Sequence, residues 1–221
     1  MIAQEQRTGI ETSNDQLSMM AKLVQRAVEN GLKALFETNI LLARNVIEAD
    51  KAINSYEIDI DNSTFSLLSF SHIPTGILRQ IISIQKINAM IERIGDHAVN
   101  IAESAISLAG AEKEINFFSL PEMATLCRKL LDDSLKSFFA KDTVLAQKVR
   151  EKDDEVDDLN KGLSQEVKAK VLNGELTFET ALDLIRVSKN LERIADLSTN
   201  IAEEATFAAI GRIIKHNGDP E

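Results

Sequence analysis

The chain has 221 residues, of which 44% are hydrophobic and 5% aromatic, and it carries a formal net charge of −10. This length and apolar content suffice for a folded core in one large domain or two small ones. The negative charge disfavours nucleic acids and anionic lipid surfaces, because their phosphates would repel the chain. We therefore expect no nucleic-acid partner.

The distribution of proline indicates an all-α fold. Only three prolines occur, and none lies in residues 75–120 or 122–219, so long helices are permitted there. Runs of alternating β-branched residues are absent, which leaves little from which to build a sheet. The start of the chain lacks a signal-peptide pattern and no apolar run approaches ~18 residues, so we expect a cytoplasmic protein without direct membrane insertion.

Three helices are predicted in the first half. Residues 1–13 are polar and predict a mobile N-terminal arm, after which apolar residues at three-four spacing indicate a helix that begins near Ser13 or Asn14. Asn39 is placed to cap a second helix, which must end before Pro74. A third helix is expected from about residue 76 to 109. The first three-helix unit therefore covers residues 14–110.

The second half repeats this order. Ser119-Leu-Pro-Glu122 has the form of a capping box and opens a helix that runs to about residue 140. Asp142 is placed to cap one continuous helix up to Asn173-Gly174, and a last helix is expected over about 177–212. We assign residues 119–214 to a second three-helix unit and residues 215–221 to a C-terminal tail.

An internal repeat relates the two halves. ERIGDHAVNIAE (92–103) and ERIADLSTNIAE (192–203) are identical at eight of twelve positions and lie 100 residues apart. LLARNVIEADKAIN (41–54) aligns with VLAQKVREKDDEVD (144–157) at an offset of 103, which places the length difference in a loop. The sequence thus predicts two tandem three-helix bundles.

Polar residues of the repeated motif share one helix face. At ~100° per residue, four of them fall within about 80° of arc, and the apolar positions lie opposite. These residues are Glu92, Asp96, Asn100 and Glu103 in the first copy and Glu192, Asp196, Asn200 and Glu203 in the second. Each preceding helix adds a row at i, i+4 and i+7: Asp50, Asn54 and Glu57, then Asp153, Asp157 and Asn160.

Carboxylates from two adjacent helices would converge on one groove and repel each other unless a cation or a basic partner neutralises them. Such oxygen-rich clusters suit hard divalent or trivalent cations. The alternative is a solvated surface in which Arg93 and Arg193 form salt bridges. His97, beside Asp96, is either an additional ligand or a plain surface or interhelix residue.

Patterns typical of other metal and catalytic sites are incomplete. Asp153-Asp154-x-x-Asp157 matches a magnesium-diphosphate motif, but Asp50-Lys51-x-x-Asn54 breaks it in the first half. A di-iron oxidase would need Glu-x-x-His pairs, which the sequence lacks. Cys127 lies in the apolar stretch MATLCRKLL, which predicts a core position rather than a nucleophile.

The tandem ERIxDxxxNIAE segments, the acidic helices before them and the ending NIAEEATFAAIGRIIKH resemble the PhoU family over about residues 14–216. The resemblance implies two tandem three-helix bundles related by a pseudo-two-fold axis, and a homodimer. It also implies a non-enzymatic cytoplasmic regulator of phosphate uptake and negative regulator of the phosphate-starvation response. Such a regulator bridges the ATPase of a phosphate ABC transporter and a sensor histidine kinase.

The resemblance further implies multinuclear metal clusters of iron, or of zinc, manganese or magnesium. The implied ligands are Glu92, Asp96, Glu192 and Asp196, supported by Asp50, Asn54, Asp153 and Asp157, with His97, Asn100, Asn200, Glu103 and Glu203 as additional candidates. Leu197 stands where the first copy has His97, and Asn54 stands where the second has Asp157, so the two sites are expected to differ. Two alternatives remain open: a metal-storage protein or metal-dependent enzyme, and a helical scaffold without a metal role.

Overall fold

The computed structural model describes residues 2–111 and 115–212, and these residues form helices and loops with no strand. The first half contains α1 (Ile2–Phe36), α2 (Ile40–Leu68) and α3 (Thr75–Leu108). The second half contains α4 (Leu120–Ala140), α5 (Thr143–Arg150), α6 (Asp153–Leu172) and α7 (Phe178–Ile210). The predicted all-α fold is confirmed, while the predicted tail at 215–221 lies outside the described residues.

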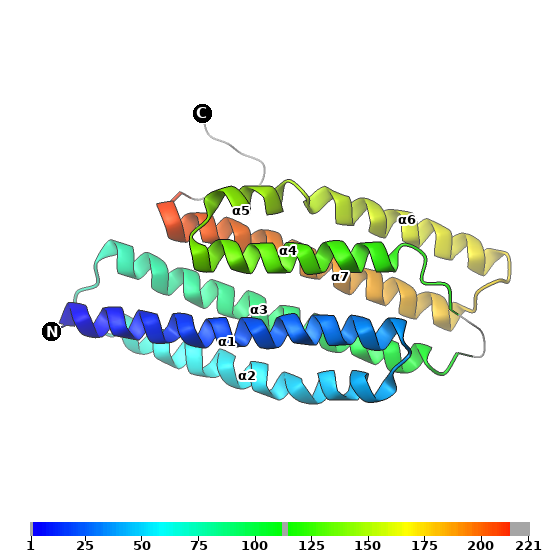
Figure 1. Ribbon diagram of the computed structural model, residues 1–221, viewed down its shortest axis with the longest axis horizontal. Helices are drawn as coiled ribbons and strands as arrows, with labels where there is room; N and C mark the ends of the chain where they lie inside the picture. Colours follow the sequence, from blue (N-terminus) through cyan, green and yellow to red (C-terminus); the bar gives the residue numbers. More distant parts are fainter. Residues whose placement is uncertain (1, 112–114, 213–221) are drawn as a thin grey trace.

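Each half forms its own bundle, and the bundles join through α3 and α7 (Figure 1). The apolar stripe of α3 is fully buried at Ile84, Ile87, Ile91 and Ile94. Burying one such side chain contributes about 1.5–3 kcal/mol, so this stripe holds α3 at the centre of the molecule. None of the described helices has an apolar stretch long enough to cross a membrane.

Helices α3 and α7 run antiparallel. His97 Nδ1 lies 2.8 Å from Asn190 Oδ1, and Ser83 Oγ donates to Glu204 at 2.7 Å. As the residue number on α3 increases from 83 to 97, the number of its partner on α7 decreases from 204 to 190. Combined with the offset of 100 residues, this order makes the two copies of the repeated motif cross near Arg93 and Arg193. The pseudo-two-fold relation between the bundles passes through this crossing.

The predicted N-terminal arm is wrong for residues 2–13, which form the first turns of α1. Gln6, Ile10 and Ser13 are buried at helical spacing, in line with the core residues that follow. Gln6 Nε2 donates to the carbonyl of His72 at 2.8 Å, and Ser13 Oγ lies 2.8 Å from Ser63 Oγ. A hydrophobicity pattern did not predict this buried face, because two of its residues are polar and form hydrogen bonds inside the bundle.

The continuous helix predicted after Asp142 is also wrong, because residues 151 and 152 separate α5 from α6. No proline or glycine lies at the break. The break places Asp153, Asp154 and Glu155 in the first turn of α6, where the helix dipole favours them. In the first half, the aligned segment EADKAINS (48–55) has fewer acidic residues, and α2 continues through it.

The predicted caps have mixed outcomes. Asn39 Oδ1 accepts from the backbone N–H of Leu42, and Asp142 Oδ1 accepts from Val144 and Leu145, as predicted. Ser119 precedes α4, but its side chain makes no capping hydrogen bond, so the predicted capping box does not form. Its backbone ψ of 0° differs from the extended conformation usual at this position.

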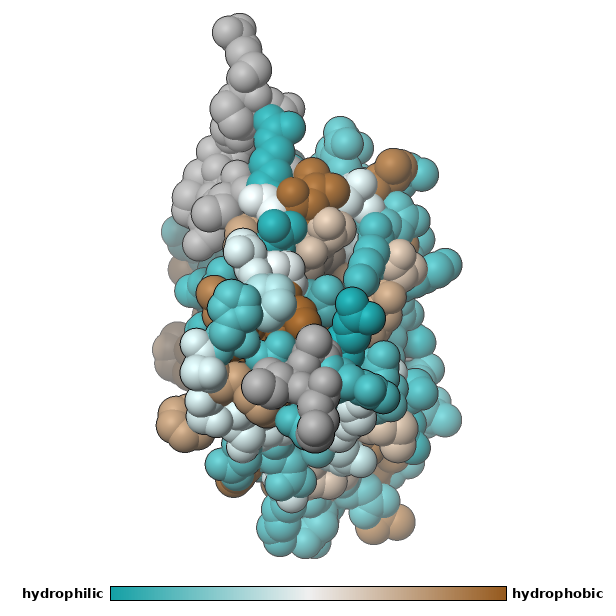
Figure 2. Space-filling model, turned by 90° about the vertical axis from the view of Figure 1, so that its left-hand side faces the viewer, coloured by the Kyte–Doolittle hydropathy of each residue, from teal (hydrophilic) through white to brown (hydrophobic). Residues whose placement is uncertain are grey.

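One end of the molecule, where the α4–α5 and α2–α3 connections lie, is shown in Figure 2. Apolar side chains appear there as separate spots among hydrophilic ones. Single exposed apolar residues are normal on a protein surface. The coloured residues at this end therefore form no continuous apolar patch in the view shown.

Candidate functional site

The structure brings the first acidic motif and the acidic row of α2 together. We call Asp50, Asn54, Glu57, Glu92 and Asp96 the first acidic cluster. Gly95 lets the two helices approach closely: a Cβ at this position would lie 3.2 Å from Ile53 Cδ1 and 3.5 Å from Asp50 Oδ1. In the first half, the acidic residues of α2 and α3 therefore lie close together, as the sequence predicted.

The carboxylates of the first acidic cluster act on one another. Burial raises the pKa of Asp50, opposed by the hydrogen bond from Asn54 and reinforced by the charge of Asp96. Burial also raises the pKa of Glu57, with smaller effects from Asp61 and Asp96. The pKa of Glu92 is raised by burial and then by Asp96, Glu57 and Asp50, while Arg93 opposes the rise. At Glu92, burial and like charges thus outweigh the opposing effect of Arg93, so negative charge in the cluster is only partly compensated.

Two oxygens of this cluster have no hydrogen-bond partner among the residues that the structure describes. Asn54 Nδ2 donates to Asp50 Oδ2 at 2.9 Å, but Asp50 Oδ1 and Asn54 Oδ1 are buried without a hydrogen bond. Buried acceptors left in this way are costly and need a donor or a cation. Oxygen-only donors of this kind fit a hard cation. In the described part of the chain, however, no three His, Cys, Asp or Glu side chains already stand close enough to hold a metal ion.

The second acidic face consists of Glu192, Asp196, Asn200 and Glu203 on α7, and basic residues of its own half neutralise it. Lys189 Nζ lies 2.5 Å from Glu192 Oε2, and Arg193 Nη1 lies 3.3 Å from Asp196 Oδ2. Arg150 Nε of α5 lies 3.9 Å from Glu203 Oε1. Asn200 is exposed.

The repeat shows why the two halves differ in charge. Lys189 stands at the position of Ala89, and Arg150 stands at the position of Ile47. The first half therefore lacks two of the three cations that the second half supplies to its own carboxylates. The expected difference between the sites is present, but it comes from these basic residues as well as from Asn54 and Leu197.

The acidic row of α6 is only partly placed. Asp157 is half-buried, and Asp153 begins α6, where its side chain lies outside the described atoms. Asn160 turns inward and is buried, and its Oδ1 accepts from Ser188 Oγ at 2.6 Å. This asparagine therefore serves the packing of α6 on α7.

The remaining candidates of the first motif face α7 rather than the first acidic cluster. His97 pairs with Asn190, as given above. Arg186 donates to Asn100 Oδ1 at 2.9 Å and to Glu103 Oε2 at 2.5 Å. The predicted single stripe is therefore divided: its first half faces the carboxylates of α2, and its second half pairs with an arginine of the other bundle.

The sequence did not reveal an ion pair between the bundles in which the glutamate is buried and the lysine is partly exposed. Glu204 is 6% exposed and accepts from Ser83 Oγ and, at 3.0 Å, from Lys86 Nζ. The Lys86 ammonium also lies 5.2 Å from the centre of the Phe207 ring, a cation–π contact. The sequence did contain one sign of this contact: the second glutamate in NIAEEA, Glu204, differs from its counterpart Ser104 in the first half.

Cys127 is a core residue, as predicted. It is fully buried, its Sγ donates to the carbonyl of Leu191 at 3.1 Å, and burial raises the pKa of its thiol. A thiol kept protonated in this way is a poor nucleophile.

These features define an all-α protein of two tandem three-helix bundles, in which the middle helix of the second bundle is broken into α5 and α6. One acidic face is partly compensated and the other is neutralised. A family model described as the PhoU domain matches the chain twice, at residues 17–105 and 120–205. The chain belongs to the PhoU family, as its motifs predicted.

Named relatives and solved structures agree with this assignment. The phosphate-specific transport system accessory protein PhoU homolog of Aquifex aeolicus is 38% identical over 207 residues, covering 94% of each chain. Homolog 1 of Thermotoga maritima is 30% identical and covers 90% of this chain and 86% of its own. The crystal structure of PhoU from Pseudomonas aeruginosa matches with a TM-score of 0.90 and 29% identity, over 93% of this chain and 99% of that one. The Streptococcus pneumoniae PhoU structure has a TM-score of 0.87 at 24% identity over 98% of this chain and 100% of that one, which supports the fold alone.

Proposed function

We propose that this protein is a non-enzymatic cytoplasmic regulator of phosphate uptake that acts as a homodimer. The observation that carries the proposal is its similarity, across both halves, to accessory proteins of phosphate-specific transport systems. In this proposal it bridges a phosphate ABC transporter ATPase and a sensor histidine kinase, and it represses the phosphate-starvation response when phosphate is plentiful. The inert thiol of Cys127 supports a role in binding rather than in covalent catalysis.

We further propose that the first acidic cluster takes up a hard cation. Asp50, Asn54, Glu57, Glu92 and Asp96 would hold it after small side-chain rotations, because their oxygens converge but do not yet form a complete ligand set. The oxygen-only donor set favours magnesium, manganese or ferric iron over zinc, which prefers nitrogen and sulfur ligands. The ion would neutralise the repulsion between α2 and α3 and so stiffen this face of the first bundle.

The proposed regulatory role is tested by deleting the gene in its own host and measuring a reporter of a phosphate-starvation promoter in ample phosphate. We expect the reporter to become active and a plasmid copy of the wild-type gene to silence it again. A reporter that stays silent after the deletion would show that the regulatory proposal is wrong.

The bridging role is tested by mild crosslinking of the tagged protein in the same cells, followed by mass spectrometry. Recovery of a transporter ATPase and a sensor kinase is the expected result. A variant with alanine at Glu92, Asp96, Glu192 and Asp196 shows whether the acidic faces are needed, and absence of both partners at every phosphate level would contradict the adaptor role.

A further inference from the structure

A groove lies between α4 and α6 in the second bundle. In the first bundle α1 packs closely along α2, whereas α6 of the second bundle packs more closely on α7 than on α4. Figure 1 shows α4 and α6 in the second bundle. The space between them has a volume of about 820 Å³ and opens along the surface. The lining residues run from Ser119 to Lys129 of α4 and from Glu155 to Glu166 of α6, so the groove extends for about 15 Å. This length accommodates about three turns of a helix.

The floor of the groove is apolar and close to the backbone. Leu126 of α4 and Leu159 of α6 line it, and both pack against the core. Gly162 lies between the walls, and a Cβ added there would meet no atom within 4 Å. Glycine inside a helix is unfavourable relative to alanine, and nothing within the described chain uses the space it leaves. The space suits close approach by another polypeptide.

The rim of the groove is acidic. Glu122 of α4 and Glu155, Asp158 and Glu166 of α6 stand against one basic residue, Lys129, which donates to Asp133 outside the groove at 2.9 Å. Exposed pairs also occur at the start of α6 and within it: Glu155 lies 4.0 Å from Lys152, which precedes the helix, and Asp158 lies 3.3 Å from Lys161. Exposed pairs of this kind contribute little, so a partner's cations can replace them.

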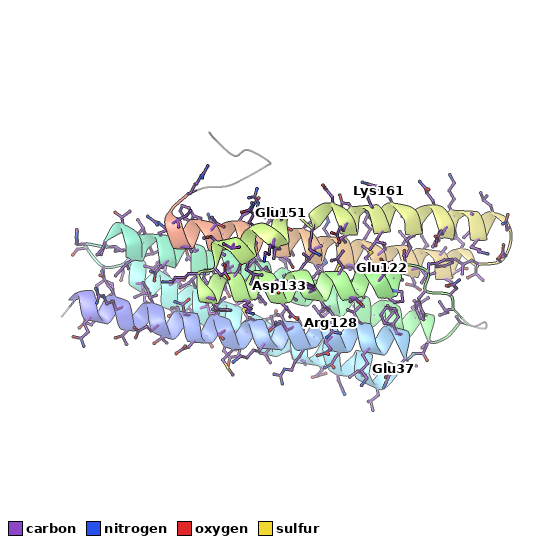
Figure 3. The ribbon with its side chains drawn as sticks, turned by 45° about the horizontal axis from the view of Figure 1, so that its top comes forward. Glu37, Glu122, Arg128, Asp133, Glu151 and Lys161 are labelled. Carbon is purple, nitrogen blue, oxygen red and sulfur yellow. The ribbon has the colours of Figure 1, made fainter. Side chains whose placement is uncertain are left out.

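Two side chains at the α4 wall have no competing partner in the described part of the chain. Ser119 Oγ lines the groove, is buried, and makes no hydrogen bond. Glu122 forms no ion pair there, and Figure 3 places it on the side of α4 that faces α6, with Lys161 on the outer side of α6. The failed capping box thus leaves both residues available to a ligand.

We propose that this groove receives a basic amphipathic helix of a partner protein. The apolar face of that helix packs on Leu126, Leu159 and Gly162, and its lysines or arginines pair with the four rim carboxylates. The partner helix would occupy the groove between α4 and α6. This inference rests on the adaptor role only in assuming that the partner is a protein.

The direct test is photo-crosslinking of the full chain in its own host. A benzoylphenylalanine introduced at Thr125, an exposed residue of the α4 wall, lies beside the groove and leaves the space at Gly162 open. The same residue at the exposed Asp59 of α2 serves as the control site. We expect an adduct specific to position 125 whose partner peptide has a positive net charge and apolar residues at three-four spacing. An adduct with an acidic segment, with a second copy of this chain only, or no adduct above the control overturns the proposal.

A binding measurement with a synthetic copy of the captured segment tests the charge and the space separately. Glu155→Lys, Asp158→Lys and Glu166→Lys together should weaken binding at least ~10-fold, because they replace attraction by repulsion. The control Glu11→Lys, Glu37→Lys and Asp59→Lys changes the net charge equally on exposed residues elsewhere and should leave binding unchanged. Equal losses in both variants would mean that only net charge matters, and would overturn the assignment to the groove.

Gly162→Phe should block the groove, whereas Gly162→Ala should keep binding and raise the melting temperature, since alanine favours the helix. Circular dichroism confirms that both variants fold. Normal binding by Gly162→Phe would overturn the inference even if the deletion strain derepresses the starvation genes. Conversely, a captured basic helix together with a silent reporter would leave the groove assigned and the regulatory proposal wrong.

Discussion

Single charged residues set the difference between the two acidic faces. Lys189 and Arg150 supply cations to the second face, and their counterparts Ala89 and Ile47 cannot. Asp50 and Asn54 of the first cluster instead keep buried oxygens without partners. A carboxylate whose pKa is raised by burial and like charges destabilises the folded state when ionised.

Glu92→Gln should therefore stabilise the protein at pH 7 in the presence of a chelator. Its raised pKa means that the folded state binds protons more readily than the unfolded state, so stability falls as pH rises through the folded pKa. Because Glu92 is partly exposed, we expect a gain of only about 0.5 kcal/mol, or roughly 1–2 °C in Tm. Below about pH 4 both states are protonated and the gain should vanish.

Glu192→Gln is the matched control, because Glu192 is paired with Lys189. Its Tm should stay the same or fall slightly at pH 7. Thermal unfolding from pH 3.5 to 8 measures both variants, and a loss of stability in Glu92→Gln at neutral pH would show that the first cluster is not strained by repulsion.

Added cation should raise the Tm of the wild-type protein through the first half alone. A ligand present at 100 times its Kd stabilises by about 2.7 kcal/mol if it binds only the folded state. The increase with manganese or magnesium should disappear in Glu92→Gln plus Asp96→Asn and persist in Glu192→Gln plus Asp196→Asn. Calorimetry with and without chelator measures this, and equal shifts in both double variants would contradict the unequal sites.

At the scale of the helices, the first turns of α1 belong to the core. Ile10→Ala should cost about 2–4 kcal/mol, because the side chain is 5% exposed and its removal leaves a cavity. The neighbouring exposed Glu11→Ala should change stability by less than about 0.5 kcal/mol. Urea unfolding of the two variants checks this, and equal stabilities would mean that residues 2–13 behave as the mobile arm that their polarity predicts.

Local signals predicted the helices better than they predicted their ends and breaks. The caps at Asn39 and Asp142 follow from side chains acting on backbone groups two or three residues away, so the sequence was sufficient for them. The buried positions of Gln6 and Ser13 depend on partners about 50 or more residues away. The break before α6 has no proline or glycine, so a search for those residues could not predict it.

For the candidate site too, the sequence predicted local features but not contacts between distant segments. Helical spacing correctly placed Glu92 and Asp96 on one face, and the repeat located their counterparts. It could not show that Arg186 reaches Asn100 and Glu103, because that contact depends on how the two bundles pack. The same holds for Glu204, whose partners Ser83 and Lys86 lie in the other half of the chain.

At the scale of the whole molecule, the buried Glu204 joins the two bundles. Glu204→Gln should cost about 1–3 kcal/mol, because it removes the charge partner of Lys86 and weakens the bond to Ser83. An exposed pair between the same two helices offers a control: Glu103→Gln, opposite Arg186, should cost under about 1 kcal/mol.

Calorimetry tests this coupling between the bundles. If Glu204 holds them together, its loss should broaden or split the unfolding transition, since weakly coupled bundles no longer melt as one unit. A single sharp transition at the wild-type temperature would show that apolar packing of α3 on α7 suffices.

The antiparallel crossing of the repeated motifs sets the two acidic faces in one rigid frame, with the second already neutralised by the protein's own lysine and arginines. Uptake of a cation by the first face, as proposed above, would make the two halves electrically alike, and its release would make them unlike again. The symmetry of the surface potential then varies with ion concentration while the fold stays constant. A partner that contacts both halves would sense the ion as a change from an asymmetric to a symmetric molecule.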